Sequence, residues 1–227
     1  MKVVALFSGG MDSTALLYYL LDQGNEVYPV SVDYGQRHRR ELDFASRTLH
    51  ELNLYSRHRI LDLSSVGKQL KGSSQTDLAV DVPHGHYAEE SMKQTVVPNR
   101  NMLMLAAAGA IAISDKAEAV AYACHEGDHT IYPDCRNEFV EQMRKAFSLC
   151  DWHNLELLTP FVTLSKADIA RAGHRLNVAW NNTWSCYEGK DIHCGACGTC
   201  VERIEAFQMA GVHDSTIYQQ ASINIEP

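Results

Sequence analysis

The sequence predicts an α/β protein in which a Rossmann-like parallel sheet is flanked by helices and carries a small C-terminal lobe. Three observations predict this class. Short apolar runs alternate with amphipathic segments, a glycine-rich loop directly follows the first apolar run, and four cysteines gather near the end of the chain. Strands that alternate with helices form parallel sheets, and such sheets bind ligands at the carboxyl ends of their strands. The 227 residues are enough for one such domain with an appendage.

The first expected strand, 3–7, is a short apolar run without alternation, which is the pattern of a strand buried on both faces. Further strands are expected at 27–32, 56–61 and 119–123. The expected helices repeat apolar residues at helical spacing, and they lie at 14–23, 39–52, 102–115, 137–150, 164–176 and 201–209. The polar stretch 64–95 predicts a long loop near the site.

Composition narrows the classes of function. Hydrophobic residues make up 45% of the chain and charged residues 21%, as in ordinary globular proteins. The formal net charge of -8 argues against a stable nucleic-acid complex, because such complexes depend on neutralising phosphates, but it permits a local site for a small anion. The start of the chain lacks the pattern of a signal peptide, and the longest apolar stretch, 102–113, is shorter than the ~18 residues of a membrane helix. We therefore expect a cytoplasmic protein that does not enter a membrane.

The glycine-rich loop at 8–13, Ser-Gly-Gly-Met-Asp-Ser, is predicted to bind the phosphates of ATP. Its two glycines let the backbone approach a ligand closely, successive N–H groups form a nest for anionic oxygens, and the following helix adds its unpaired N–H groups. The loop has neither the Gly-Lys-Ser/Thr of a Walker loop nor a Gly-x-Gly-x-x-Gly pattern. A tight turn that only caps a helix is the alternative, and the position directly after the first strand favours the ATP site.

Residues around this loop and at the exit of the second strand are the candidates for contacting ATP. A carboxylate such as that of Asp12 contacts phosphate through a bridging cation, so either Mg2+ is bound there or Asp12 caps the helix. The strand-exit residues either contact the base or ribose or only shape the turn. The candidates are Phe7, Ser8, Gly9, Gly10, Met11, Asp12, Ser13, Thr14, Asp33 and Gln36.

A second motif consists of four cysteines near the C-terminus. They are Cys186, Cys194, Cys197 and Cys200. Four thiolates at this spacing fit a structural, tetrahedral zinc site. The last three also match part of an iron–sulfur ligand run, but Ile204 occupies the place of that run's next cysteine, and unligated thiols are the third alternative. We expect Zn2+ to hold a lobe at 181–227 against a nucleotide-binding domain at 1–180.

Several further segments, in their order and spacing, are similar to one family. The segments are Asp33-Tyr34-Gly35-Gln36-Arg37-His38, Val97-Pro98-Asn99-Arg100-Asn101, Tyr132-Pro133-Asp134-Cys135-Arg136-Asn137-Glu138-Phe139, Cys186-Tyr187 and His193-Cys194-Gly195-x-Cys197-x-x-Cys200. The sequence resembles the 7-cyano-7-deazaguanine synthases of the PP-loop ATP pyrophosphatase superfamily over residues 3–207. The resemblance implies the adenine nucleotide alpha hydrolase-like form of the Rossmann-like fold.

The resemblance also implies an ATP-dependent carbon–nitrogen ligase of queuosine precursor synthesis. Its substrates are 7-carboxy-7-deazaguanine and ammonia, and free ammonium is the simplest supply because the chain has no glutaminase domain. ATP activates the carboxylate as an acyl adenylate, and ammonia displaces AMP to give an amide. A second activation, with loss of water, gives the nitrile.

Activation builds negative charge, so cationic side chains within the matched region are the expected catalysts. The catalytic candidates are Asp12, Arg100, Arg136 and Lys166. Taken singly, the cations have ordinary interpretations as a helix start, a surface ion pair and a solvated helix residue. The candidate substrate-binding residues are Asn101, Asp128, Tyr132 and Asp134, of which the two aspartates either hold Mg2+ or bind the amino-pyrimidine edge of the substrate.

Thr130 and Ile131 depart from the commoner family form, in which a small-residue turn such as Ser-Gly precedes Tyr-Pro-Asp. This departure leaves open a related enzyme that stops at the amide or that serves deazaguanine modification of DNA. A PP-loop tRNA-modifying enzyme and, outside enzymes, a zinc-dependent nucleic-acid-binding module are further alternatives, and the acidic charge argues against both. The chain length is compatible with a homodimer.

Overall fold

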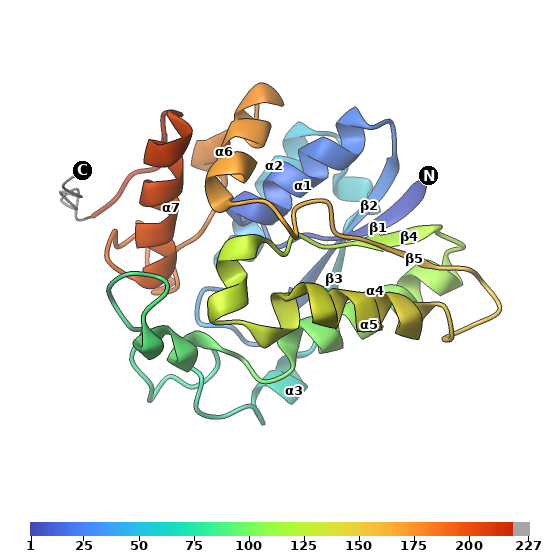
Figure 1. Ribbon diagram of the computed structural model, residues 1–227, viewed down its shortest axis with the longest axis horizontal. Coiled ribbons are helices and arrows are strands. Elements are labelled where there is room, and N and C mark those ends of the chain that lie inside the picture. Colours follow the sequence, from blue (N-terminus) through green and yellow to red (C-terminus); the bar gives the residue numbers. More distant parts are fainter. Residues whose placement is uncertain (220–227) are drawn as a thin grey trace.

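The structure, a computed structural model, describes residues 1–219 of the chain, and a parallel five-stranded sheet forms its centre (Figure 1). The strands follow the order β3-β2-β1-β4-β5, and every neighbouring pair is parallel. They are β1 (Lys2–Leu6), β2 (Glu26–Asp33), β3 (Arg59–Asp62), β4 (Ala119–Ala121) and β5 (Glu156–Leu158). The predicted fold class is confirmed.

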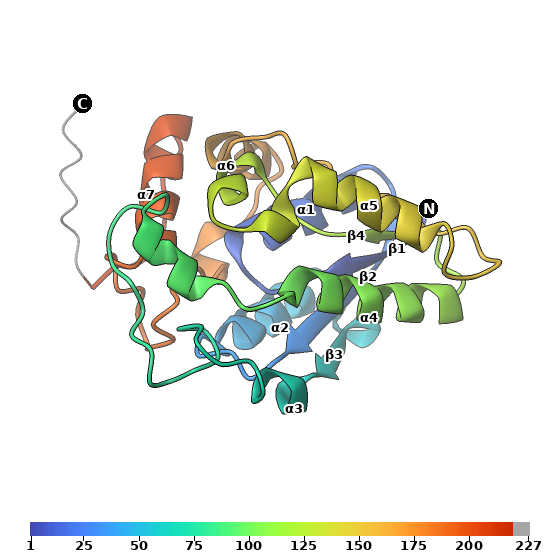
Figure 2. The same ribbon diagram turned by 60° about the horizontal axis from the view of Figure 1, so that its bottom comes forward.

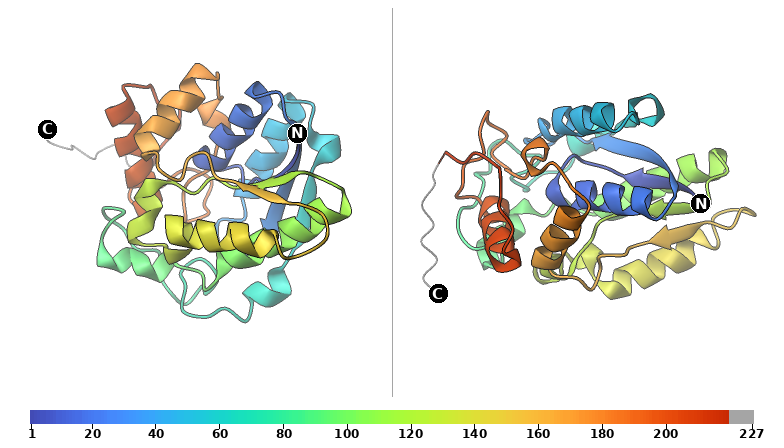
Figure 3. Two further views of the ribbon diagram at one scale, coloured as in Figure 1. Left: turned by 45° about the vertical axis from the view of Figure 1, so that its right-hand side comes forward. Right: turned by 90° about the horizontal axis from the view of Figure 1, so that it is seen from above.

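Helices cover both faces of the sheet, and the left panel of Figure 3 shows α1, α2 and α6 on one side and α4 and α5 on the other. A further helix, α7, stands at the end of the molecule beside α6. The helices are α1 (Met11–Asp22), α2 (Glu41–Glu51), α3 (Ser64–Gly67), α4 (Arg100–Ser114), α5 (Asn137–Phe147), α6 (Lys166–Arg175) and α7 (Gly198–Ala210).

Alternation along β1 divides its side chains between two cores, one on each face. Val3, Ala5 and Phe7 enter the core that α1 and α6 cover, whereas Val4 and Leu6 enter the core that α4 and α5 cover. Both faces of the strand are therefore apolar, which explains why its sequence is an unbroken apolar run.

The order of the sheet reverses at β1. β2 and β3 lie on one side of it, and β4 and β5 lie on the other. The connections that leave β1 and β4 therefore run in opposite directions, and a crevice opens beyond the carboxyl ends of these two strands. The topology fixes the place of the site, because the glycine-rich loop directly follows β1.

The predicted elements occur with shifted ends. The strand predicted at 56–61 is β3, which begins later because Tyr55–Arg57 form a short 3-10 helix. The helix predicted at 14–23 is α1, which begins at Met11, so half of the glycine-rich segment is its first turn. The sequence did not predict β5, because Glu156 is charged and the segment Glu156–Leu158 does not form an unbroken apolar run.

The stretch predicted as a long loop, 64–95, contains α3 and a short 3-10 helix at Glu90–Thr95 and is otherwise irregular. It runs from the edge of the sheet towards the start of α7 (Figure 2), where His84 and Cys197 form an isolated antiparallel bridge. Tyr87 of this loop lines the cavity described below, so the loop lies at the site, as predicted.

The C-terminal part joins the rest of the chain through α7. Ala206 and Phe207 enter the core under α1 and α6. Arg203 is fully buried and donates hydrogen bonds to both oxygens of Asp214 and to the carbonyl of Trp180. Of the lobe predicted at 181–227, the last eight residues lie outside the described part of the chain, and the boundary at residue 180 stays a prediction.

One helical stretch, Glu90–Ser114, is long and apolar enough to cross a membrane by length and composition alone. Asn99, whose backbone is left-handed (φ 57°), separates the 3-10 helix at its start from α4. Leu105, Ala108 and Ala112 of α4 lie in the protein core, so the apolar stretch is a core helix.

The glycine-rich loop passes so close to α2 that residue 9 has no room for a side chain. Gly9 has a φ of +82°, and a Cβ on it would lie 2.5 Å from the backbone N of Ala45 and 2.5 Å from the carbonyl O of Glu41. Both the backbone conformation and the space therefore require glycine. The loop is seated directly on the first turns of α2.

We predict that Gly9→Ala destabilises the protein by about 2 kcal/mol more than Gly72→Ala, because a collision with backbone adds to the cost of the left-handed conformation. Gly72 is the matched control, with a φ of +83° and no atom within 4 Å of its added Cβ. Urea unfolding of the two variants measures the difference, and equal losses of stability would show that the contact with α2 is not a constraint.

Candidate functional site

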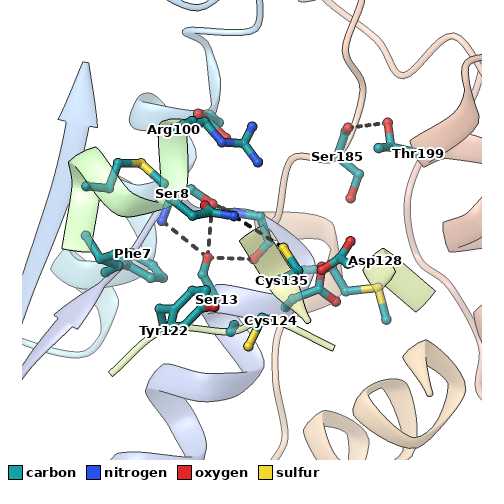
Figure 4. Close-up of a pocket in the computed structure, with 18 of the residues that line it drawn as sticks. Phe7, Ser8, Ser13, Arg100, Tyr122, Cys124, Asp128, Cys135, Ser185 and Thr199 are labelled. Carbon is teal, nitrogen blue, oxygen red and sulfur yellow. Dashed lines mark hydrogen bonds between the residues drawn. The ribbon is translucent and has the colours of Figure 1, made fainter. Parts of the chain in front are cut away.

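A cavity of about 220 Å3 opens at the carboxyl edge of the sheet. Figure 4 shows side chains facing it from the loop after β1 (Ser8, Ser13), from the start of α4 (Arg100), from the segment after β4 (Asp128) and from the C-terminal part (Thr199). Because these segments are far apart in the sequence, the fold and not any one motif assembles the cavity.

The serines of the glycine-rich loop hold it in a shape that suits an anion. Ser8 Oγ accepts a hydrogen bond from the N–H of Gly10 at 3.1 Å and lies 3.1 Å from Ser13 Oγ. Ser13 Oγ also donates to the carbonyl of Gly10 at 3.2 Å. The first N–H groups of α1 have no intrahelical acceptor and point towards the cavity end of the helix, where they attract phosphate oxygens.

Beside this loop, Lys166 forms the centre of a buried charge network. Its Nζ lies 2.6 Å from Oε2 of Glu202 and 3.2 Å from Oδ2 of Asp12. Lys166 begins α6 after Ser165, whose side chain forms a capping box with Asp168. The ammonium therefore connects the first turn of α1, the first turn of α6 and the body of α7.

Mutual charge controls the protonation of this network. Burial opposes the charge of Lys166, but the carboxylates of Asp12 and Glu202 outweigh it and raise the pKa of the ammonium. Burial likewise opposes ionisation of Asp12, yet Lys166 and His125 lower the pKa of that carboxyl. For Glu202 burial dominates and raises the pKa. The lowered pKa keeps Asp12 ionised beside the protonated Lys166.

Two buried polar atoms next to the network have no hydrogen-bond partner among residues 1–219. They are Oδ1 of Asp12 and Nε2 of His125. His125 Nε2 lies 3.5 Å from Oδ2 of Asp128, whose other oxygen accepts a hydrogen bond from the hydroxyl of Tyr87 at 3.0 Å. Buried polar atoms without partners are rare in proteins, and one of these two belongs to Asp12, which lines the cavity.

The opposite half of the cavity is aromatic and carries the second cation. The guanidinium of Arg100 lies over the ring of Tyr132, 5.8 Å from its centroid. The Tyr132 hydroxyl lies 2.6 Å from Thr95 Oγ1 and 3.3 Å from the Tyr187 hydroxyl. Burial raises the pKa of the nearby Tyr34 to about 12, so it stays protonated. Flat rings next to a guanidinium suit a planar heterocycle that carries an anionic group.

Glu41, the first residue of α2, adds a carboxylate to this aromatic half. Burial raises its pKa to about 7, against the hydrogen bond from Gln36 and the charge of Arg100. His38 Nε2 lies 3.5 Å from Oε1 of Glu41, and burial lowers the pKa of this histidine to about 3. His38 is therefore neutral at physiological pH and does not neutralise Glu41.

Most of the residues that the sequence assigned to the site line this cavity. From the predicted ATP-binding, catalytic and substrate-binding sets these are Phe7, Ser8, Gly10, Met11, Asp12, Ser13, Arg100, Asn101, Asp128, Tyr132 and Lys166. The structure thus brings Arg100, Lys166 and the glycine-rich loop, which lie on separate segments of the sequence, into one cavity. The role of each side chain in binding or catalysis stays a prediction.

The remaining assigned residues do not line the cavity, and each has another contact. Asp33 Oδ2 accepts from Arg39 Nε at 2.6 Å, and Asp134 Oδ2 accepts from the N–H of Asn101 at 3.1 Å. Arg136 is exposed and donates from Nε to a backbone carbonyl at 2.8 Å.

Three other assigned residues make contacts that hold the loops and helices around the site. Gly9 seats the loop on α2, Thr14 is buried in α1, and Gln36 hydrogen-bonds to its own loop and to Glu41. None of these six residues lines the cavity, so a direct contact with ATP or substrate remains only a prediction for them.

Sequence reasoning missed several residues that line the cavity or its charge network. They are Tyr34, His38, Glu41, Tyr87, Cys124, Trp184, Ser185, Tyr187, Thr199, His125 and Glu202. A signal existed for some of them, since Tyr34 and His38 stand in the same run as Asp33, and Tyr187 follows a metal-ligand cysteine. Glu202 had none, because only the fold brings α7 to Lys166.

The four clustered cysteines form a second site, at the start of α7. The sulfurs of Cys186, Cys194, Cys197 and Cys200 are buried and all lie within 4.8 Å of one another. Sulfurs around one ion at a Zn–S distance of about 2.3 Å lie about 3.8 Å apart in a tetrahedron, and the Cys194–Cys200 sulfurs are 3.9 Å apart. The set fits a single ion held by four thiolates.

The surroundings of this cluster support the charged form of the thiols. The N–H groups of Ala196 and Cys197 donate to the sulfur of Cys194, and the N–H of Cys194 donates to the sulfur of Cys186. Hydrogen bonds to sulfur favour the thiolate. His193, adjacent to the cluster, instead accepts from the N–H of Ser185 and is not part of the ligand set.

Comparison with known proteins agrees with these features. The model of the family described as "Queuosine biosynthesis protein QueC" matches residues 2–211. The chain is 53% identical over 219 residues to a 7-cyano-7-deazaguanine synthase of Methanoregula boonei, which covers 96% of this chain and 100% of that protein. It is 50% identical to a 7-cyano-7-deazaguanine synthase of Caldicellulosiruptor saccharolyticus, covering 96% of each chain.

Among solved structures, the chain is similar to the U34-tRNA thiolase NcsA of Methanococcus maripaludis. The sequence identity is 15% and the TM-score 0.49, over 79% of this chain and 57% of that chain.

We predict that Lys166→Met destabilises the protein by about 3–5 kcal/mol, because it leaves two buried carboxylates without their shared cation. Adding Glu202→Gln to this variant should restore part of the loss, with a coupling energy of at least about 1 kcal/mol. Urea unfolding of the two single variants and the double variant measures the coupling. Strictly additive losses would show that the two side chains do not interact energetically.

Proposed function

The chain belongs to the QueC family of queuosine biosynthesis proteins, and from this premise we propose how its cavity divides the work of making 7-cyano-7-deazaguanine. The protein is an ATP-dependent carbon–nitrogen ligase. In our proposal the loop after β1 binds the pyrophosphate part of ATP, and the aromatic half binds 7-carboxy-7-deazaguanine. The observation that supports this division is that one cavity joins an anion-binding helix end beside Lys166 to the flat, cationic surface formed by Arg100 and Tyr132.

The reaction needs two activations of the same carbon. The substrate carboxylate attacks the α-phosphorus of ATP, pyrophosphate leaves, and ammonia then displaces AMP to give the amide. The amide oxygen is activated in the same way, and loss of AMP and a proton leaves the nitrile. Each activation adds negative charge near the α-phosphate, where fixed cations in a cavity of low polarity stabilise the transition state most.

We assign the cationic tasks to Lys166 and Arg100. Lys166 is held 3.2 Å from Asp12 in the first turn of α1, so its ammonium lies at the end of the helix that receives the phosphates. Arg100 lies on the other side of the cavity, where it can neutralise the substrate carboxylate before attack. Asn101 and Tyr132 complete the proposed substrate contacts.

We assign Mg2+ to Asp12 and Asp128, because Oδ1 of Asp12 is buried without a partner among the described residues and carboxylate oxygens suit this ion. We assign Zn2+ to the four clustered cysteines. Four protein ligands fill a tetrahedral shell, so the ion's contribution there is structural: it fixes the start of α7.

Free ammonium remains our proposed nitrogen source, and the cytoplasm remains our proposed location. The acidic charge of -8 supports a protein that acts on small molecules without a stable nucleic-acid complex. A homodimer also remains part of the proposal, on chain length alone.

We predict that the purified protein, given ATP, Mg2+, ammonium and 7-carboxy-7-deazaguanine, forms the nitrile together with AMP and pyrophosphate. Chromatography with mass detection of the product is the measurement. Arg100→Met should lower kcat/KM at least ~100-fold, because it removes charge stabilisation that acts in the transition state.

Arg136→Met provides the comparison. Arg136 is exposed and lies outside the cavity, so this variant should keep kcat/KM within about 3-fold of wild type. An amide as the final product would contradict the nitrile assignment, and a large loss in Arg136→Met would return that residue to the catalytic set predicted from sequence.

We predict about one zinc per chain, and loss of most of it in Cys200→Ser, because three thiolates hold the ion less tightly than four. The matched control is Cys150→Ser, since Cys150 is exposed and lies outside the cluster. Metal analysis and thermal unfolding of both variants measure the effect. Iron with sulfide in the wild-type protein would contradict the zinc assignment.

A further inference from the structure

The carboxylate of Glu41 has no task in the reaction described so far, although it lines the same cavity and is only 8% exposed. A buried carboxylate is costly unless it meets charge or hydrogen-bond donors. A ligand in the cavity can supply such donors to Glu41.

The framework holds this carboxylate in one orientation. Gln36 Nε2 donates to Glu41 Oε1 at 2.9 Å and to the carbonyl of Val32 at 3.1 Å, while Gln36 Oε1 accepts from the N–H of Tyr34 at 2.9 Å. The Gln36 amide is thereby fixed at both ends. Oε2 of Glu41 accepts no hydrogen bond from any of residues 1–219, so Glu41 presents a preorganised acceptor to the cavity.

The charge of Arg100 makes a cation a less favourable ligand here than it would be for Glu41 alone. Arg100 is close enough to lower the pKa values of both Glu41 and His38, so its positive charge also acts on any ligand at this place. An ammonium ion would be repelled by that guanidinium, whereas a neutral N–H donor would not. His38, neutral at physiological pH, does not compete as a charged partner.

The hydrogen-bonding edges of the two heterocycles, deazaguanine and adenine, differ in how well they match the Glu41 carboxylate. A 2-amino-pyrimidin-4-one ring, as in deazaguanine, presents its ring N–H and its amino group side by side, and two adjacent donors match one carboxylate. The adenine of ATP presents a donor next to an acceptor, which would set a lone pair against a carboxylate oxygen. Glu41 therefore complements the deazaguanine and not the adenine.

The other carboxylates predicted for this task are already engaged. Asp128 accepts from Tyr87 and lies beside His125, and Asp134 accepts from Asn101 outside the cavity. Glu41 also belongs to the turn on which the phosphate loop rests, since its carbonyl lies 2.5 Å from where a Gly9 Cβ would be. A ring held by Glu41 is thus fixed relative to the loop that binds ATP.

We propose that Glu41 is the specificity-determining residue for the deazaguanine ring, and that its carboxylate accepts hydrogen bonds from the ring N–H and the 2-amino group. Gln36 is a positioning residue that aims the carboxylate. This inference rests on the proposed division of the cavity.

The test compares 7-carboxy-7-deazaguanine with the analogue that lacks the 2-amino group, in wild type and in Glu41→Gln. Wild type should prefer the natural substrate by at least ~100-fold in kcat/KM, because a site built to bind an N–H rejects a ligand without it. In Glu41→Gln the KM for the natural substrate should rise at least ~30-fold and the preference should fall below ~10-fold. The KM values for ATP and ammonium should stay within about 3-fold of wild type.

Two further variants keep the test valid if Glu41→Gln is unstable. Glu41→Asp keeps the charge but shortens the reach, and it should retain part of the preference. Glu51→Gln makes the same chemical change at the exposed end of the same helix, and it should leave every constant unchanged. Thermal unfolding and zinc content establish that each variant is folded.

The outcomes separate this inference from the proposed function. No turnover of 7-carboxy-7-deazaguanine by wild type overturns both. Turnover by wild type with an unchanged preference in Glu41→Gln overturns the inference alone. A selective rise in the KM for ATP would assign Glu41 to the ribose, and a selective rise in the KM for ammonium would assign it to the nitrogen nucleophile; either result also overturns the inference.

Discussion

The burial of one ammonium group between two carboxylates is the interaction on which the site depends. Lys166 cannot leave Asp12 and Glu202 without exposing two buried charges to an apolar surrounding. These three residues stand on α6, α1 and α7, so the same interaction fixes the phosphate loop, the central domain and the C-terminal part relative to one another. An acidic chain thereby keeps a local positive charge where an anion must bind.

The site combines two surfaces of different chemistry. On one side, backbone N–H groups, serine hydroxyls and Lys166 surround the end of a helix, which suits phosphate. On the other side, tyrosine rings, Arg100 and Glu41 surround a flat space, which suits a heterocycle with polar edges. The reversal of strand order at β1 places these surfaces next to each other. The two reactants can therefore meet without a large movement of the framework.

The parts of this arrangement that could be predicted from sequence are those that depend on residues close together in the chain. β1 is an apolar run, the loop carries two glycines in succession, and the cysteines are close in the chain, so each is readable without the fold. Arg100 was found in a matched segment, and Lys166 was found within the matched region 3–207. Glu202 could not be found, because it lies 36 residues from Lys166 and nothing local marks it.

Other differences have equally physical causes. Asp33 and Gln36 were expected either to contact the base or ribose or to shape the turn, and local hydrogen bonds hold both of them in the turn. A contact with the nucleotide stays a prediction for both. Glu41 resembles an ordinary first-turn acidic residue of a helix until the fold places it in a cavity. β5 begins with the charged Glu156 and lacks the apolar run that marked the equally short β4, so only its pairing with β4 identifies it as a strand.

The hydrogen bonds of the Gln36 amide have a consequence for mutational scans. Both of its N–H donors have partners and its carbonyl oxygen accepts from a backbone N–H, and these bonds shape its own loop and hold Glu41. In a mutational scan scored by growth, Gln36 would therefore rank with residues that touch the substrate, although its amide does not line the cavity. Sensitivity to substitution and contact with the ligand are separate properties here, and only ligand-specific kinetics distinguishes them.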